Sequence, residues 1–273
     1  MPSPDFDLQA YFDRIGYGGP AEPTLSVLRE IHRLHVAAIP FENLSPLMGE
    51  VVSLDLDALQ AKLVCGGRGG YCYEHNTLLW VALREMGFDA SGLGARVLWG
   101  APPDAPVRQR SHMALLVRLP EGPFVADVGF GGMTMSAPIA LETDTPQSTP
   151  HEPFRLVAAP DEAYDLQADA GGQWLPLYRF DLCPHLPVDY EPANWFVATH
   201  PSSPFPSHLM GARAEPHRRL ALFDARFTVR EKNRPPLERT LASLDELAQV
   251  LTNEFGLTLP TGFERIGPKL GLQ

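Results

Sequence analysis

The first ninety residues carry apolar side chains at the spacing of amphipathic helices. Apolar residues three or four positions apart lie on one face of a helix, which then packs against a core. Four such stripes follow one another, and Gly16, Gly66 and Gly87 end three of them. The stripes are Leu8, Tyr11, Phe12 and Ile15; Leu25, Leu28, Ile31 and Leu34; Leu56, Leu59 and Leu63; and Leu78, Leu79, Ala82, Leu83 and Met86. The pattern predicts a helical N-terminal region.

From about residue 90 the pattern changes to short β-rich runs separated by proline, glycine and aspartate. The expected strands cover residues 95–99, 113–119, 124–128, 154–158 and 174–180. Runs of this length and spacing favour a small antiparallel sheet or barrel. Beyond about residue 194 the pattern is mixed: residues 220–223 and 226–230 predict a hairpin, and Ser243 with Glu246 predicts a capping box that opens a helix. The fold class predicted is α+β.

Charge and composition narrow the classes of function. The 273 residues carry a net charge of -11, with 44% hydrophobic and 20% charged residues, which is typical of a globular protein. A nucleic-acid partner or an anionic membrane surface would require a basic face, so both are disfavoured. No apolar run is long enough to span a membrane, and the N-terminus lacks the features of a secretion signal. We therefore expect a cytoplasmic protein, and the sequence leaves assembly into a homo-oligomer open.

Metal and disulfide sites are not expected. Three cysteines are too few and too irregularly spaced for a disulfide framework or a zinc knuckle, so free thiols are the simpler interpretation. His32 and His35 lie three positions apart on an expected helix with no third ligand nearby in sequence. They are predicted to be ordinary core or surface histidines, and the sequence predicts no metal.

Cys72 lies between a glycine-rich turn and an apolar helix, in the run Arg68-Gly69-Gly70-Tyr71-Cys72-Tyr73-Glu74. The glycines supply backbone freedom for a tight turn. A thiol at the start of a helix faces unpaired N–H groups and the positive end of the helix dipole, which favours the thiolate. The alternative is a buried, unreactive cysteine, which is the usual fate of this residue type.

A nucleophilic cysteine needs a base and a group that orients the base. His112 begins one strongly apolar strand, and Asp127 lies near the end of the next, with residues 120–123 as a plausible turn between them. Antiparallel pairing brings the start of one strand beside the end of the following one, so both side chains are expected at one rim of the sheet. Taken singly, His112 could merely begin a strand and Asp127 could merely cap a turn.

Five motifs in a fixed order make the chain resemble the arylamine N-acetyltransferase family from about residue 6 to residue 260. They are Pro40-Phe41-Glu42-Asn43-Leu44; Arg68 to Glu74 as written above; Arg110-Ser111-His112-Met113 followed by Leu115-Leu116-Val117; Asp127-Val128-Gly129-Phe130-Gly131; and Asn194-Trp195-Phe196 with Thr199-His200-Pro201. The resemblance implies a helical bundle (1–88) with the cysteine, a β-barrel (89–193) with the histidine and aspartate, and an α/β lid (194–273), around a core like that of thiol proteases.

The resemblance also implies an activity and a set of roles. Acetyl-CoA would donate its acetyl group through a Cys72 thioester to arylamines, arylhydrazines or N-hydroxyarylamines, with His112 and Asp127 completing a triad. The residues implied for the acceptor pocket are Phe41, Tyr71, Val97, Phe130 and Phe205. Those implied for CoA are Ser111, Gly129, Gly131 and Gly132, although a glycine run after a strand is by itself more typical of a plain turn.

Glu42 and Arg68 are charged residues within apolar or glycine-rich motifs. An unpaired buried charge is costly, so we expect them to pair and to brace the loop that carries the cysteine.

Two other functions use the same residues. A papain-like or transglutaminase-like enzyme would also employ a cysteine, a histidine and an aspartate. However, Cys72 and His112 are only 40 residues apart, far closer than in papain-like proteases. A catalytically inactive CoA-binding module is the second alternative, and the complete set of three residues counts against it.

Overall fold

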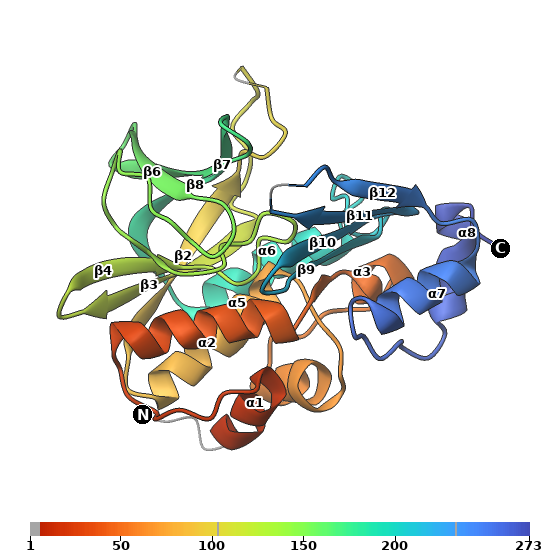
Figure 1. Cartoon of the computed structure of the whole chain (residues 1–273), viewed down its shortest axis with the longest axis horizontal. Helices are drawn as coiled ribbons and strands as arrows, with labels where there is room; N and C mark the ends of the chain where they lie inside the picture. Colours follow the sequence, from red (N-terminus) through yellow and green to blue (C-terminus); the bar gives the residue numbers. More distant parts are fainter. Residues whose placement is uncertain (1–5, 103, 233) are drawn as a thin grey trace.

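The computed structural model describes residues 6–102, 104–232 and 234–273. Figure 1 shows helices at the base, a seven-stranded antiparallel sheet above them, and a five-stranded antiparallel sheet with the C-terminal helices at the side. The seven-stranded sheet curls into a nearly closed barrel. The prediction of an α+β fold with a small antiparallel barrel is confirmed.

The helical region follows the apolar stripes closely. Its elements are α1 (Leu8–Ile15), α2 (Leu25–Ala38), α3 (Leu44–Met48), α4 (Leu56–Leu59), a π-helical continuation η1 (Gln60–Cys65), and α5 (Cys72–Glu85). The side chains of Asp7 and Thr24 accept hydrogen bonds from first-turn N–H groups of α1 and α2, as N-cap residues do. Gly16 ends α1 in the left-handed conformation, which confirms the predicted stop.

The barrel contains β2 (Asp89–Val97), β3 (His112–Leu119), β4 (Gly122–Ala126), β5 (Ile139–Ala140), β6 (Phe154–Ala159), β7 (Ala163–Asp169) and β8 (Trp174–His185). Their order across the sheet is β5-β4-β3-β2-β8-β7-β6. The segment after β5 brings the two edges together, because Thr143 and Gln147 form bridges with Leu156 and Phe154 of β6. The inward side chains form a separate core cluster that fills the barrel.

Three expected strands have clearly different bounds, and the one predicted at 174–180 continues to His185. The strand predicted at 95–99 begins at Asp89, where it pairs with Arg118, and ends at Val97. The strand predicted at 124–128 ends at Ala126. Asp127 and Val128 leave the sheet because their N–H groups bond to the side chains of His32 and Asn76.

The second sheet has the order β1-β9-β10-β11-β12. Its strands are β1 (Phe41–Glu42), β9 (Met210–Ala214), β10 (Arg218–Phe223), β11 (Arg226–Glu231) and β12 (Leu237–Thr240), and the helices nearby in sequence are α6 (Pro187–Thr199), α7 (Leu244–Asn253), η2 (Phe263–Ile266) and α8 (Gly267–Leu270). The predicted β10–β11 hairpin is confirmed. The boundary expected after residue 193 falls within α6, which the sequence analysis did not predict. β1, from the helical region, pairs with β9 and joins the first and last parts of the chain.

The capping box predicted for α7 is only half formed. Ser243 Oγ accepts from Glu246 N at 3.2 Å, but the Glu246 carboxylate accepts from Ala242 N.

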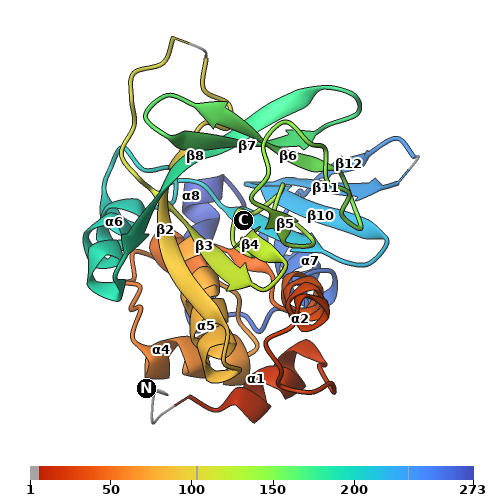
Figure 2. The same cartoon turned by 90° about the vertical axis from the view of Figure 1, so that its left-hand side faces the viewer.

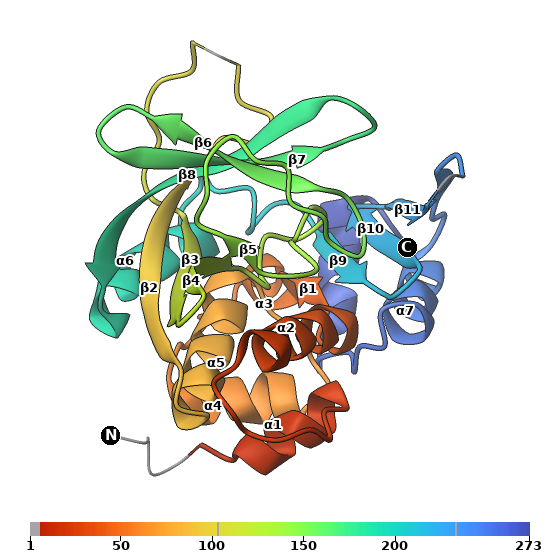
Figure 3. The ribbon, with the colours of Figure 1, turned by 60° about the vertical axis from the view of Figure 1, so that its left-hand side comes forward.

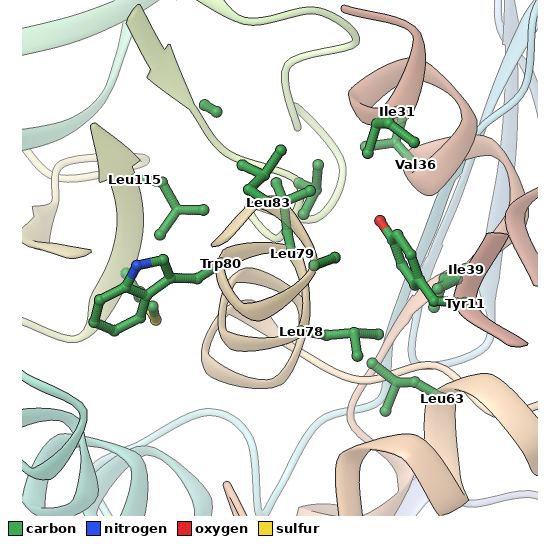
Figure 4. Packing of buried hydrophobic residues seen from close by; sticks show 14 of the residues in the cluster. Tyr11, Ile31, Val36, Ile39, Leu63, Leu78, Leu79, Trp80, Leu83 and Leu115 are labelled. Carbon is green, nitrogen blue, oxygen red and sulfur yellow. The ribbon is translucent and has the colours of Figure 1, made fainter. Parts of the chain in front are cut away.

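Helix α5 lies at the centre of the largest core cluster. It packs against β2 and β3 on one side (Figure 2), and Figure 3 shows α1 and α2 beside it. Figure 4 shows Leu78, Leu79 and Leu83 of α5 among side chains from these neighbouring elements. Apolar burial on both sides fixes the position of α5 and therefore of its first residue, Cys72. None of the described helices is long and apolar enough to cross a membrane.

Candidate active site

Cys72 is the first residue of α5, as predicted, and is 4% exposed. The first N–H groups of a helix have no partner within the helix and create a positive local field at the thiol. The neighbouring turn allows a very close backbone approach. A Cβ on Gly129 would lie 2.7 Å from Cys72 Cα, and a Cβ on Gly69 would lie 1.9 Å from the carbonyl oxygen of Pro40.

The glycines at 69 and 70 are therefore required for a different reason from the one predicted. Neither adopts a positive φ, so left-handed backbone freedom is not used there. The absence of a side chain instead allows the loop before Cys72 to pack directly on its neighbours.

Two ion pairs hold this loop. Arg68 bonds to the Glu42 carboxylate with its Nη2 at 2.7 Å and its Nε at 2.9 Å, and Glu42 is 1% exposed. The pairing predicted for these residues is confirmed. Lys62 Nζ lies 2.6 Å from Glu74 Oε1, and the other oxygen of Glu74 accepts from Tyr71 N at 3.1 Å. Sequence analysis missed this second pair, which satisfies a carboxylate that is also buried.

His112 and Asp127 meet at the rim of the barrel. His112 Nε2 lies 2.8 Å from Asp127 Oδ2, and both side chains are buried. The other carboxylate oxygen, Oδ1, accepts from Asn76 Nδ2 and from Gly129 N, each at 2.9 Å. Because Nε2 of His112 is occupied by Asp127, Nδ1 is the ring nitrogen that is free to exchange a proton with Cys72, which contacts the imidazole.

The electrostatics favour a charged imidazole. Burial alone would lower the pKa of His112, but the Asp127 carboxylate and the Cys72 sulfur outweigh it and raise the pKa to about 10. Burial likewise opposes ionisation of Asp127, but His112, Asn76 and the Gly129 N–H bring its pKa below the ordinary value. Asp127 is therefore a carboxylate and His112 an imidazolium at neutral pH.

His32 and His35 are core residues, as the sequence predicted. His32 Nε2 accepts from Asp127 N at 3.3 Å. His35 belongs to a buried hydrogen-bond chain with fixed direction: His75 Nε2 must donate to the Pro40 carbonyl, so its Nδ1 accepts from His35 Nε2, and His35 Nδ1 accepts from Tyr11. Burial brings the pKa of His32 and of His75 down to about 4, so both are neutral at pH 7.

A cavity of about 740 Å³ opens above Cys72 and His112. Aromatic and apolar side chains form most of its wall, which suits a flat aromatic ligand. The predicted residues that line it are Phe41, Val97, Phe130, Phe205, Ser111, Gly129, Gly131 and Gly132. Phe130 also packs edge-on against the His112 ring.

Tyr71 does not line the cavity. It is fully buried behind Phe205, with its ring centroid 5.3 Å from that of Phe205, and its hydroxyl donates to Asn194 Oδ1. Sequence analysis missed other lining residues, among them Trp99, Arg108 and Phe223. It also missed Asn76, which its place one helical turn after Cys72 could have revealed.

Among the described residues no group of three or more histidine, cysteine, aspartate or glutamate side chains is arranged to hold a metal ion. The three cysteines are free, with Cys65 and Cys183 exposed and Cys72 buried.

Known proteins are similar to this chain in fold and in sequence. The N-acetyltransferase family model matches residues 24–263. The arylamine N-acetyltransferase of Mycolicibacterium smegmatis is 42% identical over 93% of this chain and 92% of its own, and that of Escherichia coli is 40% identical over 92% and 88%. The structure of the Mycobacterium marinum arylamine N-acetyltransferase in complex with CoA superposes with a TM-score of 0.91, at 40% identity, and covers 97% of this chain and 98% of that one.

The fold and the matches define an acetyltransferase. More specifically, the chain belongs to the arylamine N-acetyltransferase family.

Proposed function

We propose that this protein transfers the acetyl group of acetyl-CoA to arylamines, arylhydrazines or N-hydroxyarylamines through a thioester on Cys72. The observation that carries the proposal is the arrangement of three buried groups: a cysteine at a helix start, an imidazolium in contact with it, and a carboxylate 2.8 Å from that imidazolium. Such a set activates a thiol without any added base.

In the first half-reaction the Cys72 thiolate attacks the carbonyl carbon of acetyl-CoA. A tetrahedral intermediate forms, the bond from carbon to the CoA sulfur breaks, and His112 gives its Nδ1 proton to the departing CoA thiolate. The backbone N–H of Cys72 is positioned to stabilise the oxyanion, because the first N–H groups of a helix are unpaired.

In the second half-reaction the amine nitrogen attacks the acetyl carbon of the thioester. Neutral His112 accepts the proton that the nitrogen loses, and the Cys72 thiolate leaves. The product is the acetylated amine, and the thiolate–imidazolium pair is restored. Asp127 keeps its negative charge throughout and stabilises the imidazolium.

The cavity of about 740 Å³ is the proposed site for both substrates in turn. Ser111, Gly129, Gly131 and Gly132 are the proposed CoA contacts, and Phe41, Val97, Phe130 and Phe205 are the proposed walls for the aromatic ring. In support, CoA is bound in the M. marinum relative. The role proposed for Tyr71 is to back the wall at Phe205 rather than to contact the acceptor.

Two-substrate kinetics test the proposal. A path through an acetyl-enzyme predicts parallel double-reciprocal lines when acetyl-CoA is varied at several fixed concentrations of an arylhydrazine. Lines that intersect would mean that both substrates must be bound together, and the Cys72 thioester would then be excluded. Release of amino groups from a peptide, without CoA, would favour the thiol-protease alternative.

A further inference from the structure

The segment between α6 and β9 forms one wall of the cavity but has no regular structure. Ser203, Pro204 and Phe205 line the cavity, and residues 201–208 contain neither helix nor strand. Pro201, Pro204 and Pro206 have no backbone N–H to donate. Turn hydrogen bonds within the segment, such as that from His208 N to Pro204 O at 2.8 Å, leave the carbonyls of Phe205 and His208 to hydrogen bonds from outside it.

Asn43 provides those bonds. Its Nδ2 donates to the carbonyl oxygens of Phe205 at 2.9 Å and His208 at 2.7 Å, and its Oδ1 accepts from Met210 N at 2.7 Å. Asn43 is fully buried and precedes α3, but its side chain does not cap that helix. The amide instead forms these three hydrogen bonds with residues more than 160 positions away in the sequence.

The position of Asn43 connects this wall to the nucleophile. It directly follows Glu42, which binds Arg68 in the loop before Cys72. Phe205, whose carbonyl Asn43 holds, packs with ring centroids 6.3 Å from Phe41 and 5.3 Å from Tyr71. Lys269 Nζ also binds a carbonyl of this stretch, that of Pro206 at 3.3 Å, but it does so from an exposed site.

We propose that Asn43 is a positioning residue for the acceptor: by binding the carbonyls of Phe205 and His208, it sets the aromatic wall against which the acceptor ring packs. The inference rests on the proposed function. The acetyl group and the thioester of the first substrate carry no ring to place against Phe205. Asn43 therefore acts in the second half-reaction, and its effect depends on the aromatic ring of the acceptor.

The test uses Asn43→Asp, which is nearly isosteric and retains the acceptor for Met210 N. It replaces both donors with an oxygen that faces two carbonyls, so the wall segment moves away. A difference of a single methylene group in an apolar pocket changes kcat/KM by roughly 10- to 200-fold. Because the displaced wall loses contact with the whole aromatic ring, we expect kcat/KM for an arylhydrazine to fall by at least about tenfold. With hydrazine itself, which has no ring, and in single-turnover acetylation of Cys72, we expect changes of less than about twofold. Asn253→Asp, the same change at an exposed site on α7, is the matched control.

A double-mutant cycle with Phe205→Ala tests whether Asn43 acts through that ring. In the Phe205→Ala background, Asn43→Asp should lower kcat/KM for the arylhydrazine by less than about twofold. Should Asn43→Asp fail to fold, Asn43→Ser takes its place, because it loses the amide donors without placing a charge against the carbonyls.

The outcomes separate the inference from the function on which it rests. Equal losses with hydrazine and with the arylhydrazine, or a loss in the acetylation of Cys72, would mean that Asn43 is merely structural and would overturn the inference alone. Failure of the wild-type protein to acetylate Cys72 would overturn the proposed function.

Discussion

The side-chain amide of Asn76 lies 2.9 Å from Asp127 Oδ1 and reaches it from the same helix that carries Cys72. The same amide donates to Met113 O at 2.7 Å, and its oxygen accepts from Val128 N at 3.1 Å. One buried residue therefore links the nucleophile's helix to the strand that begins with His112 and to the turn that holds the aspartate. Asn76 therefore helps to fix how the helical bundle packs on the barrel, on which the proposed triad of Cys72, His112 and Asp127 depends.

Asn76→Ala should lower the rate of Cys72 acetylation by up to about 100-fold, because a small misplacement of Asp127 misdirects the imidazole. It should also lower the free energy of unfolding by roughly 1–3 kcal/mol, since it leaves buried backbone groups unpaired. Single-turnover acetylation and urea unfolding measure the two effects. Asn253→Ala, at an exposed position, is the control, and an unchanged acetylation rate in Asn76→Ala would contradict the assigned role.

Asp127→Asn should remove the charge that stabilises the imidazolium. Burial then acts with less opposition, so the pKa of His112 falls from about 10. The proposed thiolate–imidazolium pair would lose its stabilising charge, and acetylation should slow by about 10³- to 10⁴-fold, as in known triads. Thiolate absorbance near neutral pH reports the ion pair directly. Asp165→Asn, which breaks an ion pair with Arg179 elsewhere on the barrel, should leave the absorbance unchanged.

Removal of the Glu42–Arg68 ion pair should lower the free energy of unfolding. Arg68→Ala leaves a buried carboxylate without its partner, which costs about 3–5 kcal/mol. Thermal and urea unfolding measure this loss, and Arg68→Lys should recover only part of it because lysine cannot make both bonds to Glu42. The exposed pair Arg234–Glu231 is the control: Arg234→Ala should change stability by less than about 1 kcal/mol. Equal effects at the two sites would contradict the proposed brace.

Stability should fall steeply on the acid side of neutrality. His32 and His75 have a pKa of about 4 in the folded protein and about 6.5 when unfolded. Between these values the unfolded chain binds more protons, so the free energy of unfolding falls with decreasing pH by roughly 1.4 kcal/mol per pH unit for each histidine. Asp127 adds to the acid loss because its folded pKa is depressed. His112 acts in the opposite direction: its contribution is complete below pH 6.5 and is lost as pH rises towards 10.

Urea unfolding at several pH values tests this dependence. His75→Gln should reduce the pH dependence of the free energy of unfolding between pH 6 and pH 4 by about one proton, and His217→Gln, at an exposed position, is the matched control. A wild-type stability that is flat over this range would contradict the assignment.

The sequence was most informative where local rules decide the structure. Helix stripes predicted α1, α2 and α5, with glycine stops for α1 and α5, and the charge of Glu42 and Arg68 in apolar surroundings predicted their ion pair. Long-range contacts were not predictable, because no local pattern encodes them. Asn43 directly precedes α3, yet its side chain does not cap that helix and binds carbonyls more than 160 positions away in the sequence. Tyr71 has the aromatic side chain expected of a pocket residue, but it is buried and its hydroxyl bonds to Asn194.

Intact-protein mass after mixing with acetyl-CoA alone tests the central claim most directly. We expect the wild-type protein, and the Cys65→Ala and Cys183→Ala controls at the two exposed thiols, to gain one acetyl group that an arylhydrazine then removes. Cys72→Ala should gain none. Absence of the adduct in the folded, reduced wild-type protein, or its persistence in Cys72→Ala, would contradict a Cys72 acetyl-enzyme.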